Sequence, residues 1–367
     1  MHWKIDKRFG DVPTQNDIEE TDEISSLAYS PDGSLLAVGD CGGRIVLFRD
    51  ASDKSASYST EFQGHDETFD VLSNRGNSPE VTSLNWCHWG LLSSNHKTMK
   101  LWNTKNLRKP KLKQTFKNVH VHPIHSVHSN SDGATVLSAD NLQIYMWSLE
   151  TSSSQAFLLY DMTPPCIASI QEAITTTIFH PQHCYELLWG TTKGSICIAD
   201  LRCAPRVTSH KTLSPRMKRP RKYDGITKVI SDACYLDCGT KCLSRDYVDM
   251  TLWDTRFEAK PIHTWPIHES LRSSFDFIYD IDAMYHRFRC SATRIYAVTG
   301  TYANTFAVFN LNKLEKQEKL YHATTTFPLA TGTASLYEPL LHVSCNPKFP
   351  SIAAATQYNL YFFKQYY

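Results

Sequence analysis

The chain has 367 residues, of which 41% are apolar, enough to bury a sizeable core in one or two domains. Lysine and arginine (38) nearly balance aspartate and glutamate (37), so no net charge draws the chain to nucleic acid or to an anionic membrane. Residues 1–10 lack the pattern of a signal peptide, no run of about 18 apolar residues occurs and the eleven cysteines are scattered, so we expect a soluble protein of a reducing compartment, the cytoplasm or the nucleus.

The first predicted elements are three short strands. Residues 24–29 form an apolar strand, the Ser-Pro-Asp-Gly run at 30–33 is a turn, and residues 35–39 form a second strand. A glycine turn at residues 42–43 leads to a third strand at 45–48. Together these segments predict one antiparallel repeat.

The same pattern returns six more times. The further copies begin near residues 81, 124, 174, 229, 283 and 341, and in most of them the third strand contains an aromatic residue. Trp253 and Asp254 form the Trp-Asp pair that is typical of WD repeats, and the pairs that begin at Trp102 and Trp147 are degenerate versions. The evidence is that such a pair recurs at the same position of several repeats, because a single dipeptide indicates little.

Seven copies of a four-stranded sheet predict an all-β fold, a seven-bladed WD-repeat β-propeller that occupies residues 1–367 as a single domain. The last copy ends almost at the C-terminus and lacks its outer strand. We expect residues 2–6 to supply that strand and so to close the ring by pairing the two ends of the chain.

The chain carries no motif for catalysis. It has no Gly-x-Gly-x-x-Gly or phosphate loop, no Gly-x-Ser-x-Gly elbow and no His-Glu-x-x-His. We therefore expect no catalytic residue, no metal and no cofactor. A propeller enzyme is the least supported interpretation, because no nucleophile with a base and no paired acids are visible.

Two clusters of possible metal ligands have simpler explanations. His120, His122, His125 and His128 have the spacing that places side chains on one face of a strand, and imidazole is a common ligand. Histidines that precede a blade, however, more often satisfy local polar groups. Cys234, Cys238 and Cys242 are spaced by fours, but they straddle a predicted turn, so the outer two belong to different strands and are expected to be core thiols.

Two loops have a local charge. Residues 205–222 contain seven lysines and arginines and no acid, a pattern found in nuclear-import signals and anion-binding patches but more often in a solvated linker. Ser214 lies within this segment before a proline, as a possible phosphorylation site. Residues 17–23 are acidic and precede the first repeat, where they would attract basic peptides or form a solvated loop.

Several blade-specific strings resemble one family. Residues 118–132 (NVHVHPIHSVHSNSD) look like the signature of the WD-repeat, 55-kDa regulatory B subunits of protein phosphatase 2A. Residues 39–48, 137–140, 244–254, 268–273, 299–304 and 354–362 are also similar to family segments. The resemblance covers nearly the whole chain and lies in loops that the general WD frame does not specify.

The resemblance implies a non-catalytic subunit that joins a phosphatase catalytic subunit and a helical-repeat scaffold in a heterotrimer and recruits phosphoprotein substrates. It implies neither nucleic acid nor membrane as a partner. The family grips basic or helical substrate segments with an acidic, partly apolar face. The positions that match the family's substrate contacts are Glu20, Phe69, His122, Asn141, Ile170, Tyr279, Asp282 and Arg287. Each also has an ordinary interpretation, as loop packing or as a surface charge.

The chain departs from the family at three places. Cys41 stands where the family usually has a lysine, and Asn141 replaces an aspartate. The connection at residues 106–117 is much shorter than the hairpin arm with which family members reach the scaffold. This divergence supports an alternative, a free-standing WD-repeat scaffold for other proteins that no longer binds the phosphatase.

Overall fold

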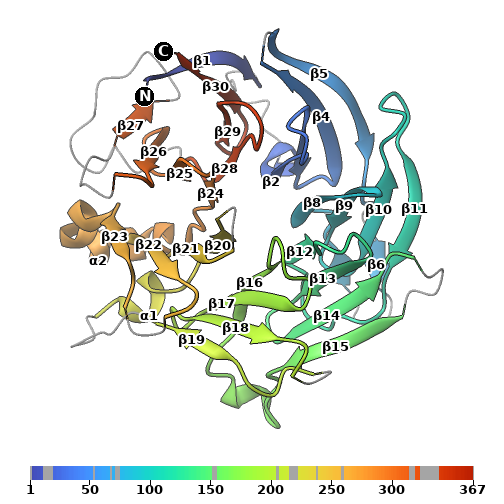
Figure 1. Ribbon diagram of the computed structural model, residues 1–367, viewed down its shortest axis with the longest axis vertical. Helices are drawn as coiled ribbons and strands as arrows, with labels where there is room; N and C mark the ends of the chain where they lie inside the picture. The colour runs from blue at the N-terminus through green and yellow to red at the C-terminus, as the bar shows by residue number, and fades with distance from the viewer. Residues whose placement is uncertain are drawn as a thin grey trace. The chain divides into compact units, whose positions relative to one another are not determined.

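The computed structural model describes residues 2–10, 20–52, 54–66, 68–70, 75–150, 155–203, 206–214, 222–236, 239–257, 260–313, 319–322 and 339–366. Within these residues the chain forms seven four-stranded sheets and one short hairpin (Figure 1). The predicted all-β class and the predicted number of blades are confirmed. Among the described residues no helix has the length and apolar character needed to span a membrane.

Each sheet is built from strands that follow one another in the chain, apart from the closing sheet, which combines both ends. The first sheet has β2 (Ile24–Tyr29), β3 (Leu35–Asp40), β4 (Arg44–Ala51) and β5 (Lys54–Gln63), and the second has β8 (Ser83–Cys87), β9 (Gly90–Ser94), β10 (Met99–Asn103) and β11 (Lys111–Phe116). The third has β12 (Ser126–Ser129), β13 (Thr135–Ala139), β14 (Gln143–Ser148) and β15 (Ala156–Asp161), and the fourth has β16 (Ile174–Phe179), β17 (Glu186–Thr191), β18 (Ile196–Asp200) and β19 (Lys211–Leu213). The fifth has β20 (Asp232–Tyr235), β21 (Lys241–Arg245), β22 (Asp249–Asp254) and β23 (His263–Pro266), and the sixth has β24 (Cys290–Ala292), β25 (Tyr296–Gly300), β26 (Thr305–Asn310) and β27 (Lys319–His322). The closing sheet has β28 (His342–Cys345), β29 (Ser351–Ala355), β30 (Leu360–Tyr366) and β1 (His2–Phe9).

By its internal contacts the chain divides into two compact units, which we describe separately. Unit 1 comprises Met1–Asn141, Tyr145–Phe157 and His342–Tyr367. Unit 2 comprises Leu142–Ile144 and Leu158–Leu341. The single-domain interpretation of residues 1–367 stays a prediction.

The strand predicted to pair the two chain ends does so within unit 1. β1 runs antiparallel to β30, from His2 opposite Tyr366 to Phe9 opposite Leu360, and Figure 1 shows the blue strand beside the red one. Asp6 also accepts a hydrogen bond of 2.9 Å from the hydroxyl of Ser55 on β5. The closing sheet is thereby joined to the first sheet.

Three boundaries differ from those predicted. The third sheet begins at Ser126 and not at residue 124, so only His128 of the four histidines lies on a strand. The sixth sheet begins at Cys290, because Ala283–Tyr285 form a 3-10 helix, η4, ahead of it. Half of the presumed connection at 106–117 is the outer strand β11, and the connection itself is limited to residues 104–110.

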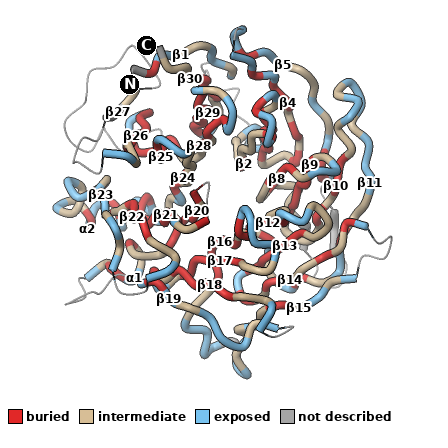
Figure 2. The backbone as a smooth tube through the Cα atoms, in the orientation of Figure 1, coloured by how far each residue is buried: buried red, intermediate tan, exposed pale blue. Residues whose placement is uncertain are grey.

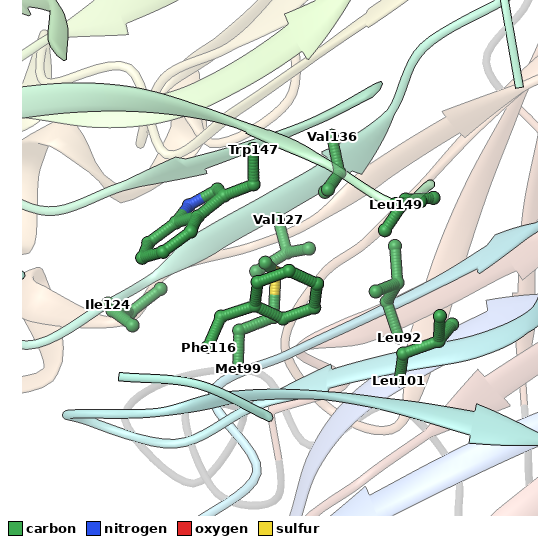
Figure 3. Packing of buried hydrophobic residues seen from close by; sticks show 9 residues of the cluster. All are labelled: Leu92, Met99, Leu101, Phe116, Ile124, Val127, Val136, Trp147 and Leu149. Atoms are coloured by element: carbon green, nitrogen blue, oxygen red, sulfur yellow. The ribbon is translucent and has the colours of Figure 1, made fainter. Parts of the chain in front are cut away.

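Apolar side chains fill the space between neighbouring sheets. Figure 2 shows that β9 and β13 are mostly buried, whereas long stretches of the outer strands β5 and β11 are exposed. Between the second and third sheets, Phe116 and Trp147 pack edge to face with ring centroids 5.3 Å apart. Figure 3 shows them among the other side chains of this cluster: Leu92, Met99, Leu101, Ile124, Val127, Val136 and Leu149. Burial of this apolar surface is the main source of cohesion between blades.

The recurring third-strand tryptophan has a structural cause. Trp102, Trp147 and Trp253 each donate the indole N–H to a serine hydroxyl nine residues earlier, on the second strand of the same sheet, at 2.7–2.9 Å. The acceptors are Ser93, Ser138 and Ser244. Because a buried indole N–H needs a partner, this bond fixes the tryptophan and explains why the aromatic position recurs.

Candidate functional site

All eight predicted site residues lie at the same end of their own sheets. In an antiparallel four-stranded sheet, one end holds the start of the first strand, the turn between the second and third strands, and the end of the fourth strand. We call this end the leading end of the sheet. The opposite end is the trailing end. Asn141 lies in the turn between the second and third strands of its sheet, and the other seven lie between the fourth strand of one sheet and the first strand of the next. The residues predicted from the sequence thus share the leading end of their sheets.

Unit 1 contains four of these residues on three leading-end connections and one turn. Glu20 begins a short 3-10 helix, η1 (Glu20–Asp22), and is exposed. His122 is half-buried ahead of β12, and Asn141 is exposed at the leading end of the same third sheet. Phe69 lies in the hairpin strand β6 (Thr68–Asp70), whose partner is β7 (Arg75–Asn77), and its backbone pairs with that of Gly76.

Acidic groups gather around Glu20. Asp22 bridges Arg44 at 2.8 Å, and burial raises the pKa of Glu23, with the neighbouring Glu80 and Glu20 adding to the rise. Burial also raises the pKa of the Cys41 thiol to about 12, so this side chain is neutral at physiological pH. Of the acidic stretch at residues 17–23, only residues 20–23 fall within the described structure.

Unit 2 contains the other four. Ile170 is exposed after the 3-10 helix η2 (Ile167–Ser169). Tyr279, Asp282 and Arg287 follow β23 on the long connection to β24. This connection includes three helices, η3 (Glu269–Ser274), α2 (Phe275–Asp280) and η4, which we call the helical segment (residues 269–285).

The structure brings Tyr279 and Asp282 together at the end of α2. Asp282 adopts a left-handed backbone (φ 57°), and its N–H donates to the carbonyl of Tyr279 at 3.1 Å. Arg287 is exposed beyond η4, and Ile170 lies on a different connection. The structure therefore places Tyr279 and Asp282 on one exposed turn, with Arg287 close behind in the chain.

A buried polar network supports the helical segment. The hydroxyl of Tyr302 donates to the carbonyl of Ala283 at 2.9 Å and shares a hydrogen bond of 2.8 Å with the hydroxyl of Tyr247. His268 approaches the carbonyl of Tyr247 at 2.7 Å; burial and the positive charge of Arg245 hold its pKa well below the ordinary value. Neutral His268 therefore bonds without burying a second charge beside Arg245.

The helical segment exposes more apolar side chains than the sequence analysis identified. Phe275 and Ile278 are buried one turn apart, so the intervening residues face outward. Phe277, Tyr279, Ile281 and Tyr285 are between 43% and 55% exposed, and Asp280 is exposed among them. The alternation of aromatic and acidic residues over 275–282 was the available signal. This surface is acidic and partly apolar, and it suits a basic or amphipathic segment.

Aromatic and charged side chains also frame a small cavity beside η3. It has a volume of about 300 Å³ and is lined by Lys222, Tyr223, Asp224, Arg272, Phe275 and Asp276. Its charges are largely paired: Lys222 bridges Asp276 at 2.6 Å, and Arg272 bridges Glu269 at the same distance. Both cations that line the cavity are therefore paired with carboxylates.

One member of the histidine cluster, His120, has a structural role. His120 is buried, with Nε2 2.7 Å from the hydroxyl of Ser138 and Nδ1 2.9 Å from the carboxylate of Asp140. Within the part of the chain that the structure describes, no group of three or more His, Cys, Asp or Glu side chains could hold a metal ion. Cys234 and Cys242 lie on different strands of the fifth sheet, as predicted.

Part of the basic loop falls outside the described residues. Residues 206–214 and 222 are described, and 205 and 215–221 are not. Ser214 is exposed just after β19. Its phosphorylation stays a prediction.

Comparison with known proteins gives two results. Residues 14–49 match the family model "WD domain, G-beta repeat". The chain is 31% identical to the "Protein phosphatase PP2A 55 kDa regulatory subunit" of Drosophila melanogaster, over 95% of this chain and 84% of that protein. It is 32% identical to the regulatory B subunit of protein phosphatase PP2A from Schizosaccharomyces pombe, over 84% and 77%. It is 28% identical to the alpha isoform of the 55 kDa regulatory B subunit from Arabidopsis thaliana, over 85% and 80%.

Proposed function

The chain belongs to the family of 55 kDa regulatory B subunits of protein phosphatase 2A, and from this premise we propose that it recruits phosphoprotein substrates to the catalytic subunit within a heterotrimer. The observation that carries the proposal is similarity at 31–32% identity over 84–95% of the chain. Its relatives are named as regulatory subunits, and the chain is a regulator rather than an enzyme.

Tethering is sufficient to explain how such a subunit acts. A surface that holds a phosphoprotein beside the catalytic metals of another subunit raises the local concentration of the phosphorylated residue. No group of the chain has to touch the phosphate for this effect. Selectivity then depends on which segments the surface binds.

For this chain, we propose the leading-end residues of each unit as substrate contacts. Within unit 2 the exposed Tyr279 and Ile281 would take apolar side chains of a substrate segment, and Asp280 and Asp282 would attract its lysines and arginines. The proposal also includes the other predicted residues at the leading ends of their sheets. These are Glu20, Phe69, His122 and Asn141 in unit 1, and Ile170 and Arg287 in unit 2.

The test is capture of the phosphatase by the purified full-length chain. We expect the immobilised chain to retain purified scaffold and catalytic subunits of protein phosphatase 2A, and the variant Asp282→Lys to retain them equally. A chain that captures neither subunit would leave the rival interpretation, a free-standing WD-repeat scaffold. That rival rests on the short connection at residues 104–110, and the similarity to named regulatory subunits does not favour it.

A further inference from the structure

The trailing end of the second sheet carries a concentrated positive charge. Residues 81–131 contain no aspartate or glutamate but eight lysines and arginines. Five of these cations lie on the connection from β10 to β11 and on β11 itself, and all five are exposed. With two neighbouring apolar residues they form what we call the basic face: Lys105, Arg108, Lys109, Lys111, Lys113, Leu112 and Trp89.

A β-bulge directs one of these lysines onto an exposed tryptophan. Leu101 pairs with Gln114 and Trp102 with Leu112, so Lys113 is the extra residue on β11. Its ammonium lies 3.6 Å from the ring centroid of Trp89, in the turn between β8 and β9. The indole N–H of Trp89 donates to the carbonyl of Gly133 at 3.0 Å. These contacts hold the aromatic and the cation in a fixed arrangement.

The positive charge of the basic face is not neutralised within the described part of the chain, where none of its five cations forms an ion pair. The side chains of Asn103 and Asn106 accept hydrogen bonds from the backbone N–H groups of Lys105 and Arg108, which shapes the connection and leaves the cations in solvent. Asp132, in the neighbouring turn, accepts bonds from the N–H of Ala134 and from Thr135. Local contacts therefore occupy this carboxylate.

We propose that the basic face binds an acidic segment of a protein partner, with Leu112 as its apolar contact. Leu112 is 48% exposed beside Lys111 and Lys113, so a carboxylate-rich segment with one apolar side chain would match both features. Stacking of nucleic-acid bases on Trp89 is disfavoured, because Lys113 covers one face of the ring and the N–H edge is bonded inward. Insertion into a membrane is disfavoured by the small apolar area.

The experiment measures direct binding of a labelled, glutamate-rich synthetic peptide containing one leucine to the full-length chain by fluorescence polarisation. We expect Lys109→Glu with Lys111→Glu to weaken binding by about tenfold or more, and added salt to weaken binding to the unaltered chain. Leu112→Ser is expected to weaken it by a smaller factor without altering the salt dependence. The assay needs no phosphatase, so its outcome is independent of the function proposed above.

The matched control reverses two exposed charges elsewhere in unit 1, Arg49→Glu with Lys348→Glu. Equal weakening by the control pair, or no weakening by the first pair, would overturn the proposal. It would also be overturned if a single-stranded oligonucleotide or vesicles containing phosphatidylserine bound at the basic face while the peptide did not. Circular dichroism of both variants checks that the sheets remain folded.

Discussion

At the scale of single residues, the same buried hydrogen bonds between polar side chains recur in several sheets. In the third sheet, Ser138 accepts the indole N–H of Trp147 at 2.7 Å and also bonds His120, which contacts Asp140. Ser93 plays the same part for Trp102 and His65 in the second sheet. Because these groups are buried, removing one of them leaves its partners without a hydrogen bond.

Replacing Ser138 with alanine tests this role. The change orphans the indole N–H of Trp147 and Nε2 of His120, so we expect the free energy of unfolding to fall by about 2–3 kcal/mol. Denaturation in urea, followed by fluorescence, measures it. Ser57→Ala, at an exposed position of β5, is the control and should stay within about 0.5 kcal/mol of the unaltered chain. An equal loss in both variants would contradict the assignment.

His65 predicts a loss of stability in acid. Burial, with the charge of Lys100, lowers its pKa from the ordinary 6.5 to about 3 in the folded chain. The unfolded chain therefore binds the proton more readily, so the stability from this residue is complete above about pH 6.5 and declines as pH falls toward 3.

The measurement compares unfolding free energies at pH 7 and pH 5. The extra loss attributable to His65 should be about 2 kcal/mol, and His65→Gln should lack it. A variant with the same pH dependence as the unaltered chain would show that other groups cause the decline.

At the scale of elements, the connections carry the proposed site and the sheets position them. The helical segment is the longest described leading-end insertion of unit 2, and its buried face packs on Tyr247, Val248 and Phe288. Its outer face is left to solvent with aromatic and acidic side chains. A change on that outer face should therefore alter binding and not folding.

Asp282→Lys is the corresponding variant. Reversing this charge should weaken binding of a basic substrate peptide by about tenfold, about 1.4 kcal/mol, measured by titration calorimetry. Because Asp282 has a left-handed backbone, Asp282→Asn is a second variant that tolerates this conformation and removes only one charge. Glu150→Lys, an exposed site at the trailing end of the third sheet, is the control. Unchanged affinity in both Asp282 variants would exclude this residue from the surface.

At the scale of the whole molecule, the described residues form seven four-stranded sheets of one design, joined by many short connections. Under the proposed function, such a molecule would change which substrates a phosphatase acts on, while the chemistry would stay in the catalytic subunit. We therefore expect the chain to affect the hydrolysis of large and small substrates differently.

We expect addition of the chain to the scaffold and catalytic subunits to raise kcat/KM for a phosphoprotein with a basic docking segment by about tenfold or more. The value for a small aryl phosphate should stay constant, and the chain alone should hydrolyse neither. Parallel steady-state assays on the two substrates measure this. A similar increase on both substrates would indicate activation of the catalytic subunit in place of recruitment.

The sequence by itself determined the all-β class, the number of sheets, the closing strand and the class of connection that carries the predicted site, because alternating apolar residues and turn residues act locally. The family strings, which are specific to individual loops, then identified the relatives. Tertiary structure decided the rest. The start of the sixth sheet at Cys290, the outward face of the helical segment and the contact of Lys113 with Trp89 all depend on packing between residues far apart in the chain. The helix and strand propensities of single residues do not specify such contacts.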